Sequence, residues 1–279
     1  MKYALLNGKN IEALPDTRAI CPNCKKPVIS KCGTSNIWHW SHFPEIHCDT
    51  WWENESEWHR NWKSQFPSEY QEVILFNESS GEKHIADIRL SNGLVIELQN
   101  SPINENELFS REQFYGNMLW VVNGLNFSNQ FFVFPFKLPP PNSELASLIE
   151  IDREPALNKG IVRFMDACGE ESEFQKPILF HKTKSLRVGS SGNYFSGKIT
   201  ANGIYDPTVE VQKEIELVHD GHYFFEWKNK RKVWFKSNKH IYIDFGNENI
   251  AQLCAFNSNI FWVRVINKIN FINGLKGHA

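Results

Sequence analysis

The stretch "HIADIRLSNGLVIELQNSPI", residues 84–103, decides how the middle of this chain folds. Two runs of apolar and β-branched residues flank Asn92-Gly93, a pattern typical of a β-hairpin. Two acids, Asp87 and Glu97, interrupt the apolar pattern of the two expected strands. The central question is whether these acids only cover a sheet surface or bind a ligand.

The length of the turn determines which side chains share a face of the hairpin. A two-residue loop places Asp87 and Glu97 on opposite faces, and both faces then mix apolar and charged groups. A three-residue loop over 91–93 collects the apolar residues on one face and puts Gly93 in the left-handed position of a G1 bulge. Because a one-residue slip moves every side chain to the other face, burial favours the three-residue loop.

The favoured register sets Asp87 directly opposite Glu97. Like charges in this arrangement cost up to about 1 kcal/mol on an open sheet. A divalent cation such as Mg²⁺ or Mn²⁺ between them would remove the repulsion, since hard cations prefer carboxylate oxygens. The alternative is a solvated face on which Arg89 neutralises one carboxylate.

The surrounding sequence predicts a mixed α/β domain over residues 49–137. Trp58, Trp62 and Phe66 recur at helical spacing in a segment without Gly or Pro, and short apolar runs before and after the hairpin indicate strands. The expected elements are helices over 52–66 and 104–117 and strands over 71–77, within 84–100, over 118–124 and at an edge over 130–136. The predicted core order is α-β-β-β-α-β.

Two further regions flank this predicted core. Residues 1–48 are rich in turns and contain four of the six cysteines. The proline-rich "KLPPPNSE", residues 137–144, is typical of a linker. Residues 145–279 contain aromatic and β-branched runs such as "GHYFFEWKNKRKVWFKS" and "KHIYIDFG", which predict a β-rich accessory domain.

Composition narrows the class of protein. The 279 residues carry a formal net charge of −2, which argues against a basic nucleic-acid-binding surface over the whole molecule but not against a local basic patch. Six cysteines are too few for a disulfide scaffold in a chain of this length. An early Gly-Lys-Asn turn and the lack of a long apolar run predict a soluble, cytoplasmic protein without a membrane partner.

The cysteine-rich segment contains a metal-binding pattern. Cys21 and Cys24 form a C-x-x-C knuckle, and His39 and His42 follow 14 residues after it. Two thiolates and two imidazoles suit tetrahedral Zn²⁺. Four protein ligands leave no open position on the metal, so the predicted role is structural.

Other interpretations of this segment stay open. His47 and Cys48 are the alternative ligands if either histidine faces away. The four side chains can also form an unligated cluster with the neighbouring Trp38 and Trp40.

These motifs together resemble the CoiA-like competence proteins, whose nuclease domain resembles the PD-(D/E)xK superfamily. The resemblance covers roughly residues 1–125. The matching positions are Asp87, the E-x-Q element Glu97-Leu98-Gln99, the helix motif of Glu55, Ser56, His59 and Lys63, the pair Arg111 and Tyr115, and the segments 21–28 and 39–43 of a zinc-finger-like module.

The resemblance implies a restriction-endonuclease-like core and metal-dependent hydrolysis of DNA, with other DNA-processing proteins as further partners. Asp87 and Glu97 would bind Mg²⁺ or Mn²⁺, and Glu55 would complete the ligand set. Gln99 and Lys63 would position the attacking water or stabilise charge. The implied substrate-binding residues are His59, Arg111 and Tyr115.

One departure from the wider superfamily concerns position 99, where Gln99 replaces the usual lysine. Glutamine cannot supply the charge that helps to orient and deprotonate water. Lys63 is predicted to share a helix face with Glu55 and His59, and it can supply that charge. The alternative is a catalytically inactive DNA-binding or adaptor protein that retains the nuclease fold.

Overall fold

The computed structural model of the chain describes residues 1–34, 37–44, 48–51, 53, 55–152, 161–165, 171–175, 178–181, 198–200, 203–205, 207–257 and 260–277. The chain divides into two compact units. Unit 1 comprises Met1–Leu125, Arg231–Ile250 and Asn267–Ala279, and unit 2 comprises Asn126–Lys230 and Ala251–Ile266. Each unit combines segments that are far apart in the sequence.

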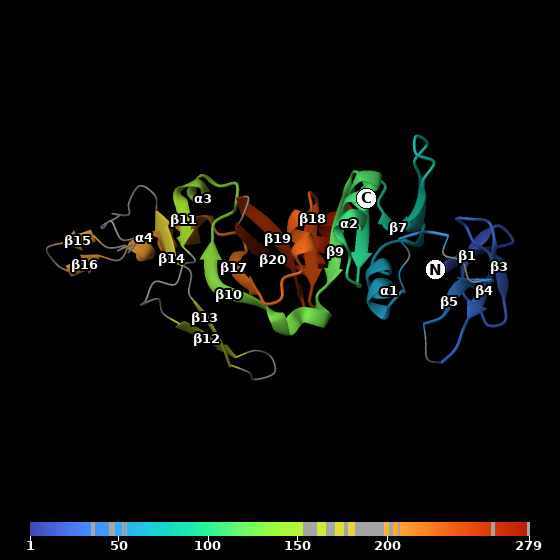
Figure 1. Cartoon of the computed structure of the whole chain (residues 1–279), viewed down its shortest axis with the longest axis horizontal. Helices are drawn as coiled ribbons and strands as arrows, with labels where there is room; N and C mark the ends of the chain where they lie inside the picture. The colour runs from blue at the N-terminus through green and yellow to red at the C-terminus, as the bar shows by residue number, and fades with distance from the viewer. Residues whose placement is uncertain are drawn as a thin grey trace. The chain divides into compact units, whose positions relative to one another are not determined.

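The N-terminal part of unit 1 is a five-stranded sheet, drawn in blue in Figure 1. Its strands are β1 (Tyr3–Leu6), β2 (Lys9–Glu12), β3 (Arg18–Ile20), β4 (Pro27–Lys31) and β5 (His39–His42), in the order β2-β1-β3-β4-β5. Trp40 is 1% exposed and packs with small residues such as Ala4 and Ala19. Its indole nitrogen donates to the Ile11 carbonyl at 3.0 Å, so one tryptophan closes the core of this module.

The rest of unit 1 has the α-β-β-β-α-β element order that the sequence predicts. Its elements are α1 (Glu57–Lys63), a 3₁₀ turn η1 (Ser68–Tyr70), β6 (Gln71–Phe76), β7 (Lys83–Arg89), β8 (Val95–Gln99), α2 (Glu105–Tyr115) and β9 (Met118–Asn123). Strands β6, β7 and β8 pair antiparallel, and β9 is parallel to β8. Helix α2 makes the crossover that two parallel neighbours require.

The β7–β8 hairpin has the predicted three-residue loop. Leu90 N donates to Leu94 O at 2.9 Å, Ile88 pairs with Ile96, and Gly93 has φ +84°. A side chain at that φ would be strained, so glycine is required there. The apolar face of the hairpin is buried, with Ala86, Ile88, Leu90, Ile96 and Leu98 all exposed by 2% or less.

Helix α1 is shorter than the predicted 52–66 because a capping box fixes its start. The Ser56 hydroxyl accepts from His59 N, and the His59 ring accepts from Ser56 N. Trp58 and Trp62 lie on one side of the helix, and both donate their indole N–H to the Asp244 carboxylate, at 3.0 and 2.7 Å. The tryptophans that were predicted to pack in the core therefore also bind a buried acid, Asp244.

That acid belongs to β18 (His240–Asp244), a strand from the segment predicted as part of a separate domain. Strand β18 is parallel to β9, with His240 opposite Leu119 and Asp244 opposite Asn123. The sheet of unit 1 therefore has the order β18-β9-β8-β7-β6. The structure differs here from the expected 145–279 accessory domain, because pairing with β9 places residues 231–250 in unit 1.

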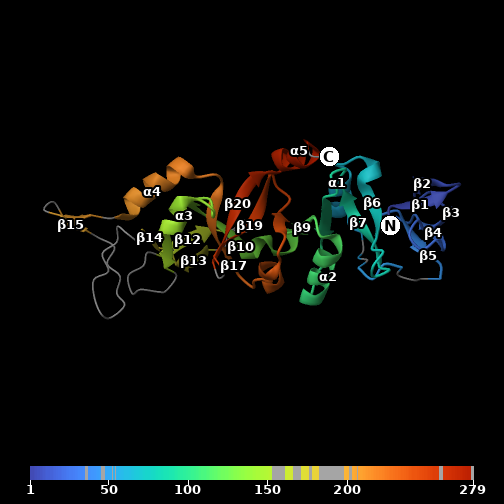
Figure 2. The same ribbon diagram turned by 90° about the horizontal axis from the view of Figure 1, so that it is seen from above.

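Two helical segments accompany β18 in unit 1. The 3₁₀ helix η3 (Lys232–Lys236) replaces an expected strand, and its Trp234 meets Trp120 edge to face at 5.5 Å. Figure 2 shows α5 (Lys268–Gly277) beside α1, where the Lys268 ammonium lies 5.7 Å from the Trp62 ring. The C-terminal residues thus cover the same helix that carries the predicted site motif.

Unit 2 contains a sheet with the order β10-β17-β20-β19. The elements assigned to this region are η2 (Leu125–Gln130), β10 (Phe131–Leu138), α3 (Glu144–Leu148), β11 (Ile149–Asp152), β12 (Ile161–Met165), β13 (Glu171–Gln175), β14 (Ile178–His181), β15 (Lys198–Thr200), β16 (Gly203–Tyr205), α4 (Pro207–Val218), β17 (His222–Trp227), β19 (Asn249–Asn257) and β20 (Ile260–Asn267). The expected linker at 137–144 lies inside this unit, because β10 pairs with β17 up to Leu138. Among the described helices of the chain, none is long and apolar enough to cross a lipid bilayer.

Candidate functional site

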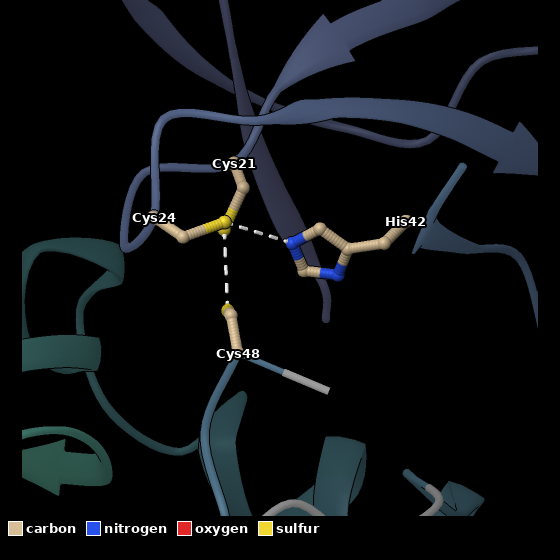
Figure 3. A group of neighbouring side chains, drawn as sticks. All are labelled: Cys21, Cys24, His42 and Cys48. Carbon is tan, nitrogen blue, oxygen red and sulfur yellow. Dashed lines mark hydrogen bonds between the residues drawn. The ribbon is translucent and has the colours of Figure 1, made fainter. Parts of the chain in front are cut away.

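Three cysteines and one histidine converge in the N-terminal module (Figure 3). Cys21 and Cys24 lie in the turn between β3 and β4, His42 ends β5, and Cys48 comes from the segment that follows. Their potential ligand atoms all lie within 4.8 Å of one another. The Cys21 and Cys48 sulfurs are 3.8 Å apart, close to the separation expected for two thiolates about 2.3 Å from a tetrahedral Zn²⁺.

The fourth ligand differs from the main prediction. His39 lies outside the group, and its Nδ1 is 2.8 Å from the Ile37 carbonyl. Side chains three residues apart on a strand point to opposite faces, so His39 and His42 of β5 cannot both face the cysteines. Cys48, one of the two alternative ligands, takes the position, while His47 lies outside the described residues.

The electrostatics of the cluster favour a thiolate. A hydrogen bond with Cys48 lowers the pKa of Cys21 to about 4, against the effect of burial. The same contact, together with burial, raises the pKa of Cys48. Because the thiolate is the form that binds metal, the donor set and the lowered pKa of Cys21 suit Zn²⁺, whereas Cys48 has to lose its proton when a metal binds.

A second group of polar residues lines a pocket of about 90 Å³ in unit 1. Every residue of the nuclease-like pattern lines it, with the exceptions of Gln99 and the cap residue Ser56. The sequence did not point to five further lining residues that carry polar or aromatic contacts: Met1, Asp49, Trp51, Glu53 and Glu72. The pocket therefore joins the N-terminal module to the strands and helices of the core.

Asp87 and Glu97 face each other across the hairpin as the register predicts. Leu98 N donates to Asp87 Oδ2 at 3.0 Å, and Asp87 N donates to Glu97 Oε1 at 3.3 Å. Glu97 is only 3% exposed, and burial and the charge of Asp87 raise its pKa to about 8. The solvated face neutralised by Arg89 is therefore not what the structure shows.

Lys63 extends from α1 to the centre of the carboxylates. Its ammonium lies 2.7 Å from Glu55 Oε1, 3.1 Å from Glu72 Oε1 and 3.6 Å from Asp87 Oδ1. Burial acts against the charged form, but the surrounding carboxylates outweigh it and raise the pKa of Lys63. A positive charge thus stands beside Asp87 although position 99 is not a lysine.

Glu72 is held in a conformation that few residues other than glycine adopt. Its φ is +51° within β6, and its carboxylate accepts from Lys2 N at 2.9 Å and from Tyr3 N at 3.1 Å as well as from Lys63. Burial would raise the pKa of Glu72, but the charge of Lys63 and these backbone bonds lower it to about 2. The residue ties β1 to the pocket, and only its place as an acid in the apolar run "QEVILF" hinted at a role.

Gln99 is placed differently from its predicted role. It is 2% exposed and does not line the pocket, and its amide nitrogen donates to Glu53 Oε2 at 3.3 Å and Ser101 O at 3.1 Å. Glu53 also accepts from Asn100 N and from the hydroxyl of Ser101. Gln99 therefore helps to anchor the segment before α1.

His59 has a similar anchoring position. Its Nδ1 accepts from Ser56 N in the capping box, and its Nε2 lies 2.7 Å from Glu53 Oε1 and 3.2 Å from Leu98 O. Burial would lower the pKa of His59, but the hydrogen bond to Glu53 and the charge of Asp87 raise it overall. Both ring nitrogens are engaged within the chain, so His59 positions α1 against β8.

Arg111 binds carboxylates in this structure rather than presenting its guanidinium to the pocket opening. Nη1 donates to Glu97 Oε2 at 3.1 Å, and Nη2 donates to Trp51 O at 2.8 Å and Glu107 Oε1 at 2.5 Å. Tyr115 lies one turn further along α2, and burial and the charge of Glu97 raise its pKa, so its hydroxyl stays protonated.

The segment from 48 to 53 connects the two groups. Asp49 follows the cluster residue Cys48 and accepts from His84 Nδ1 and Ile85 N of β7, both at 2.8 Å. Trp51 stacks on the His84 ring with 3.3 Å between the ring centroids. Asp49, Trp51 and Glu53 line the pocket, so the residues that directly follow the cysteine cluster form one side of the carboxylate pocket.

These features define a mixed α/β protein with an N-terminal Cys₃His group and a pocket of buried carboxylates. Residues 5–50 match the family model described as the N-terminal domain of competence protein CoiA. The match includes all four residues of the cluster. A search of curated proteins finds no match. A search of solved structures finds none either.

Proposed function

We propose that this protein is a nuclease of the PD-(D/E)xK type that hydrolyses DNA with the aid of Mg²⁺ or Mn²⁺. The α-β-β-β-α-β order with β9 parallel to β8 is consistent with a restriction-endonuclease-like core. The match of residues 5–50 to the CoiA N-terminal domain supports a role in competence or in the processing of foreign DNA.

The observation that carries this proposal is the arrangement of Asp87, Glu97 and Lys63. Two carboxylates of adjacent strands face one another in a pocket, and one of them is buried. Burial and the charge of Asp87 keep the pKa of Glu97 near 8, and a cation close to both carboxylates would relieve the repulsion between them. An ammonium group 3.6 Å from Asp87 completes the combination of charges that phosphodiester hydrolysis uses.

In the proposed mechanism, Asp87 and Glu97 would hold the cation. Glu55, which contacts the Lys63 ammonium at 2.7 Å, would complete the ligand set. A bound Mg²⁺ or Mn²⁺ supplies Lewis-acid activation of the phosphate and of water. Lys63 has a raised pKa and stays protonated, so it stabilises negative charge on the phosphate and does not act as a base. Arg111 orients Glu97 through its 3.1 Å contact.

The Cys₃His group is proposed to hold structural Zn²⁺. Cys21, Cys24, His42 and Cys48 supply four ligands and leave no position for water or substrate. A metal bound to Cys48 would also fix the position of the adjacent Asp49, which lines the pocket. Zinc in this role stabilises the module and takes no part in hydrolysis.

A specific observation also favours the alternative, an inactive DNA-binding or adaptor protein. Lys63 and Arg111 already neutralise the pocket carboxylates, and the carboxylate oxygens do not form a group as tight as the Cys₃His cluster among the described residues. Gln99 is committed to Glu53 and Ser101. A pocket of this kind is stable without a metal.

The deciding experiment compares the wild-type protein with Asp87→Asn and Glu97→Gln on single- and double-stranded DNA with Mn²⁺ or Mg²⁺. We expect each substitution to lower the cleavage rate by about 100-fold or more, because even outer-sphere partners of metal ligands contribute 10- to 100-fold. Mn²⁺ affinity, measured by calorimetry, should fall in parallel.

The matched control is Glu105→Gln, which removes an exposed carboxylate of α2 that pairs with Lys236 at the surface. It should cleave DNA as the wild-type protein does. Equal cleavage by the wild type and both pocket variants would disprove the assignment of these carboxylates. Absence of both Mn²⁺ binding and cleavage in the wild type would favour the adaptor.

A further inference from the structure

One buried acid of unit 1 takes no part in the proposed mechanism. Asp244 is 1% exposed and ends β18, which lies two strands away from β8 in the sheet. A carboxylate buried to this degree is costly unless its oxygen atoms receive hydrogen bonds. The donors that bind Asp244 therefore show which parts of the chain this residue holds together.

Both oxygens of the Asp244 carboxylate accept hydrogen bonds, and each oxygen binds a different part of the chain. Oδ2 accepts from the indole N–H of Trp58 at 3.0 Å and from that of Trp62 at 2.7 Å. Oδ1 accepts from Gly246 N at 2.9 Å and from the Lys268 ammonium at 2.7 Å. One oxygen thus binds α1, and the other binds the segment after β18 and the first residue of α5.

Helix α1 depends on such contacts for its position because it is short. It has seven residues, and a helix of about two turns is not stable alone in water. Its start is fixed by the capping box of Ser56 and by the contact of His59 with Glu53. Trp58 and Trp62 lie one turn apart, so their bonds to one oxygen tie both turns of the helix to β18.

The anchor of α1 is also the anchor of the pocket cation, because Lys63 directly follows Trp62. The Lys63 side chain is 4% exposed, and its ammonium lies 3.6 Å from Asp87 Oδ1. Lys268 reinforces the anchor, since its ammonium bonds to Asp244 and lies 5.7 Å from the centre of the Trp62 ring. A shift of α1 that broke the indole bonds would therefore also withdraw Lys63 from Asp87.

We propose that Asp244 is a positioning residue, which holds Lys63 beside Asp87 by binding the two tryptophans of α1. Asp244 acts through the helix and touches neither the substrate nor the cation. Hydrogen bonds to an ionised group are stronger than those between neutral groups, so one buried carboxylate fixes both rings. This inference rests on the proposed nuclease function for the task of Lys63, but the position of Lys63 is measurable without cleavage.

The first test measures how well Lys63 is held, in the full chain and without DNA. An acylating reagent, N-hydroxysuccinimidyl acetate, is added, and the modification of Lys63 is followed by mass spectrometry. Because Lys63 is buried and ion-paired, it reacts only when α1 opens locally. Trp58→Phe and Trp62→Phe each remove one indole N–H and keep an aromatic ring. We expect each to raise the labelling rate about tenfold, the effect of losing a hydrogen bond to a charged group.

Trp40→Phe is the matched control for these substitutions. Trp40 is equally buried, and its indole N–H donates to the Ile11 carbonyl at 3.0 Å, but it lies in the N-terminal sheet and not on α1. It should leave the labelling of Lys63 unchanged. Trp58 is only half-buried, so Trp58→Phe keeps the test decisive if Trp62→Phe does not fold. Equal labelling rates in the wild type and all folded variants would overturn the proposal.

The second test measures cleavage of DNA with Mn²⁺. A misplaced Lys63 should lower kcat by about 10- to 100-fold and leave KM unchanged, because its charge is needed in the transition state. The affinity for Mn²⁺ should rise, since the cation competes less with the ammonium beside Asp87. A merely structural role of Asp244 would reduce the folded fraction and change none of these constants. An unchanged kcat in a variant whose Lys63 labels faster would also overturn the proposal.

The two tests separate this proposal from the nuclease assignment. If the wild type does not cleave DNA but the tryptophan variants expose Lys63 to the reagent, the anchoring of Lys63 by Asp244 stands and the nuclease proposal fails. If cleavage depends on Asp87 but labelling and kcat are the same in the tryptophan variants as in the wild type, the nuclease proposal stands and the positioning role of Asp244 fails.

Discussion

The Cys₃His group and the carboxylate pocket of unit 1 differ in how their polar side chains are compensated. In the Cys₃His group, four potential ligand atoms converge, and no lysine or arginine is recorded in contact with them among the described residues. In the carboxylate pocket, Lys63 and Arg111 already stand against the acids. The first cluster offers four potential ligands to a cation, whereas the second is compensated by its own side chains.

This difference indicates whether the part of the chain around each cluster needs a metal ion in order to fold. A thiolate cluster without a metal leaves charge and ligand atoms unsatisfied, and metal binding then becomes folding free energy. A pocket that is neutralised from within folds without an ion, and any catalytic cation has to compete with an ammonium and a guanidinium group. The first metal is expected to bind tightly and the second loosely.

The largest expected effect comes from breaking the first cluster. Cys48→Ala should lower the bound zinc from about one per chain, because it removes one of four ligands and leaves the fourth position to water. Structural zinc contributes about 10 kcal/mol or more to folding in small modules, so residues 1–48 should become sensitive to proteases. Metal analysis and limited proteolysis measure both results.

His39→Ala is the matched control for this substitution, since His39 lies outside the cluster. It should retain its zinc and its resistance to proteases. Loss of zinc in His39→Ala with retention in Cys48→Ala would restore the Cys₂His₂ arrangement that the sequence spacing alone suggested.

The next effect comes from removing the internal cation of the second cluster. Lys63→Met leaves three carboxylates without their common partner and should lower the free energy of unfolding by about 3–5 kcal/mol. Adding Mn²⁺ should recover part of this loss, because a cation can now take the place of the ammonium. Urea unfolding with and without Mn²⁺ measures both changes.

Lys236→Met provides the comparison for Lys63→Met. Lys236 pairs with Glu105 at the surface, where both side chains are 50% exposed, so the expected loss is less than about 1 kcal/mol. A Lys63→Met variant that is no less stable than Lys236→Met would show that the pocket carboxylates are not held by Lys63.

A smaller effect follows from the lowered pKa of Glu72. A carboxyl whose pKa falls from 4.5 to about 2 on folding stabilises the protein above pH 4.5, and this contribution disappears as the pH drops from about 5 to 2. The expected size is on the order of 2–3 kcal/mol. Glu72→Gln should be less stable at pH 7 and lose less stability on acidification, as measured by unfolding at a series of pH values.

Which features could be predicted from the sequence depended on how many residues separate the contacting partners along the chain. The hairpin register followed from burial and one glycine, Gly93, within a stretch of 20 residues. The choice of His39 was wrong because motif spacing was applied without the alternation of a strand, although β5 could have been recognised. The role of Glu72 was hinted at only by its place in an apolar run, because two of its partners are the backbone N–H groups of Lys2 and Tyr3, 70 and 69 residues away.

The same reasoning explains the missed strand β18. Residues 240–244 looked like any apolar strand, and nothing local indicated that they pair with β9. Its Asp244 is buried because two tryptophans of α1, Trp58 and Trp62, donate to it. Each of these contacts spans more than 180 residues, beyond the reach of periodicity or spacing.

Strand β18 also sets the order of events when the protein is made. Strand β9 is buried over its whole length, yet its parallel neighbour leaves the ribosome about 120 residues later. At about 5–20 residues per second, this delay lasts roughly 6–24 s. During that time the nascent chain carries an unpaired apolar strand edge, the type of surface that chaperones protect and that aggregation exploits.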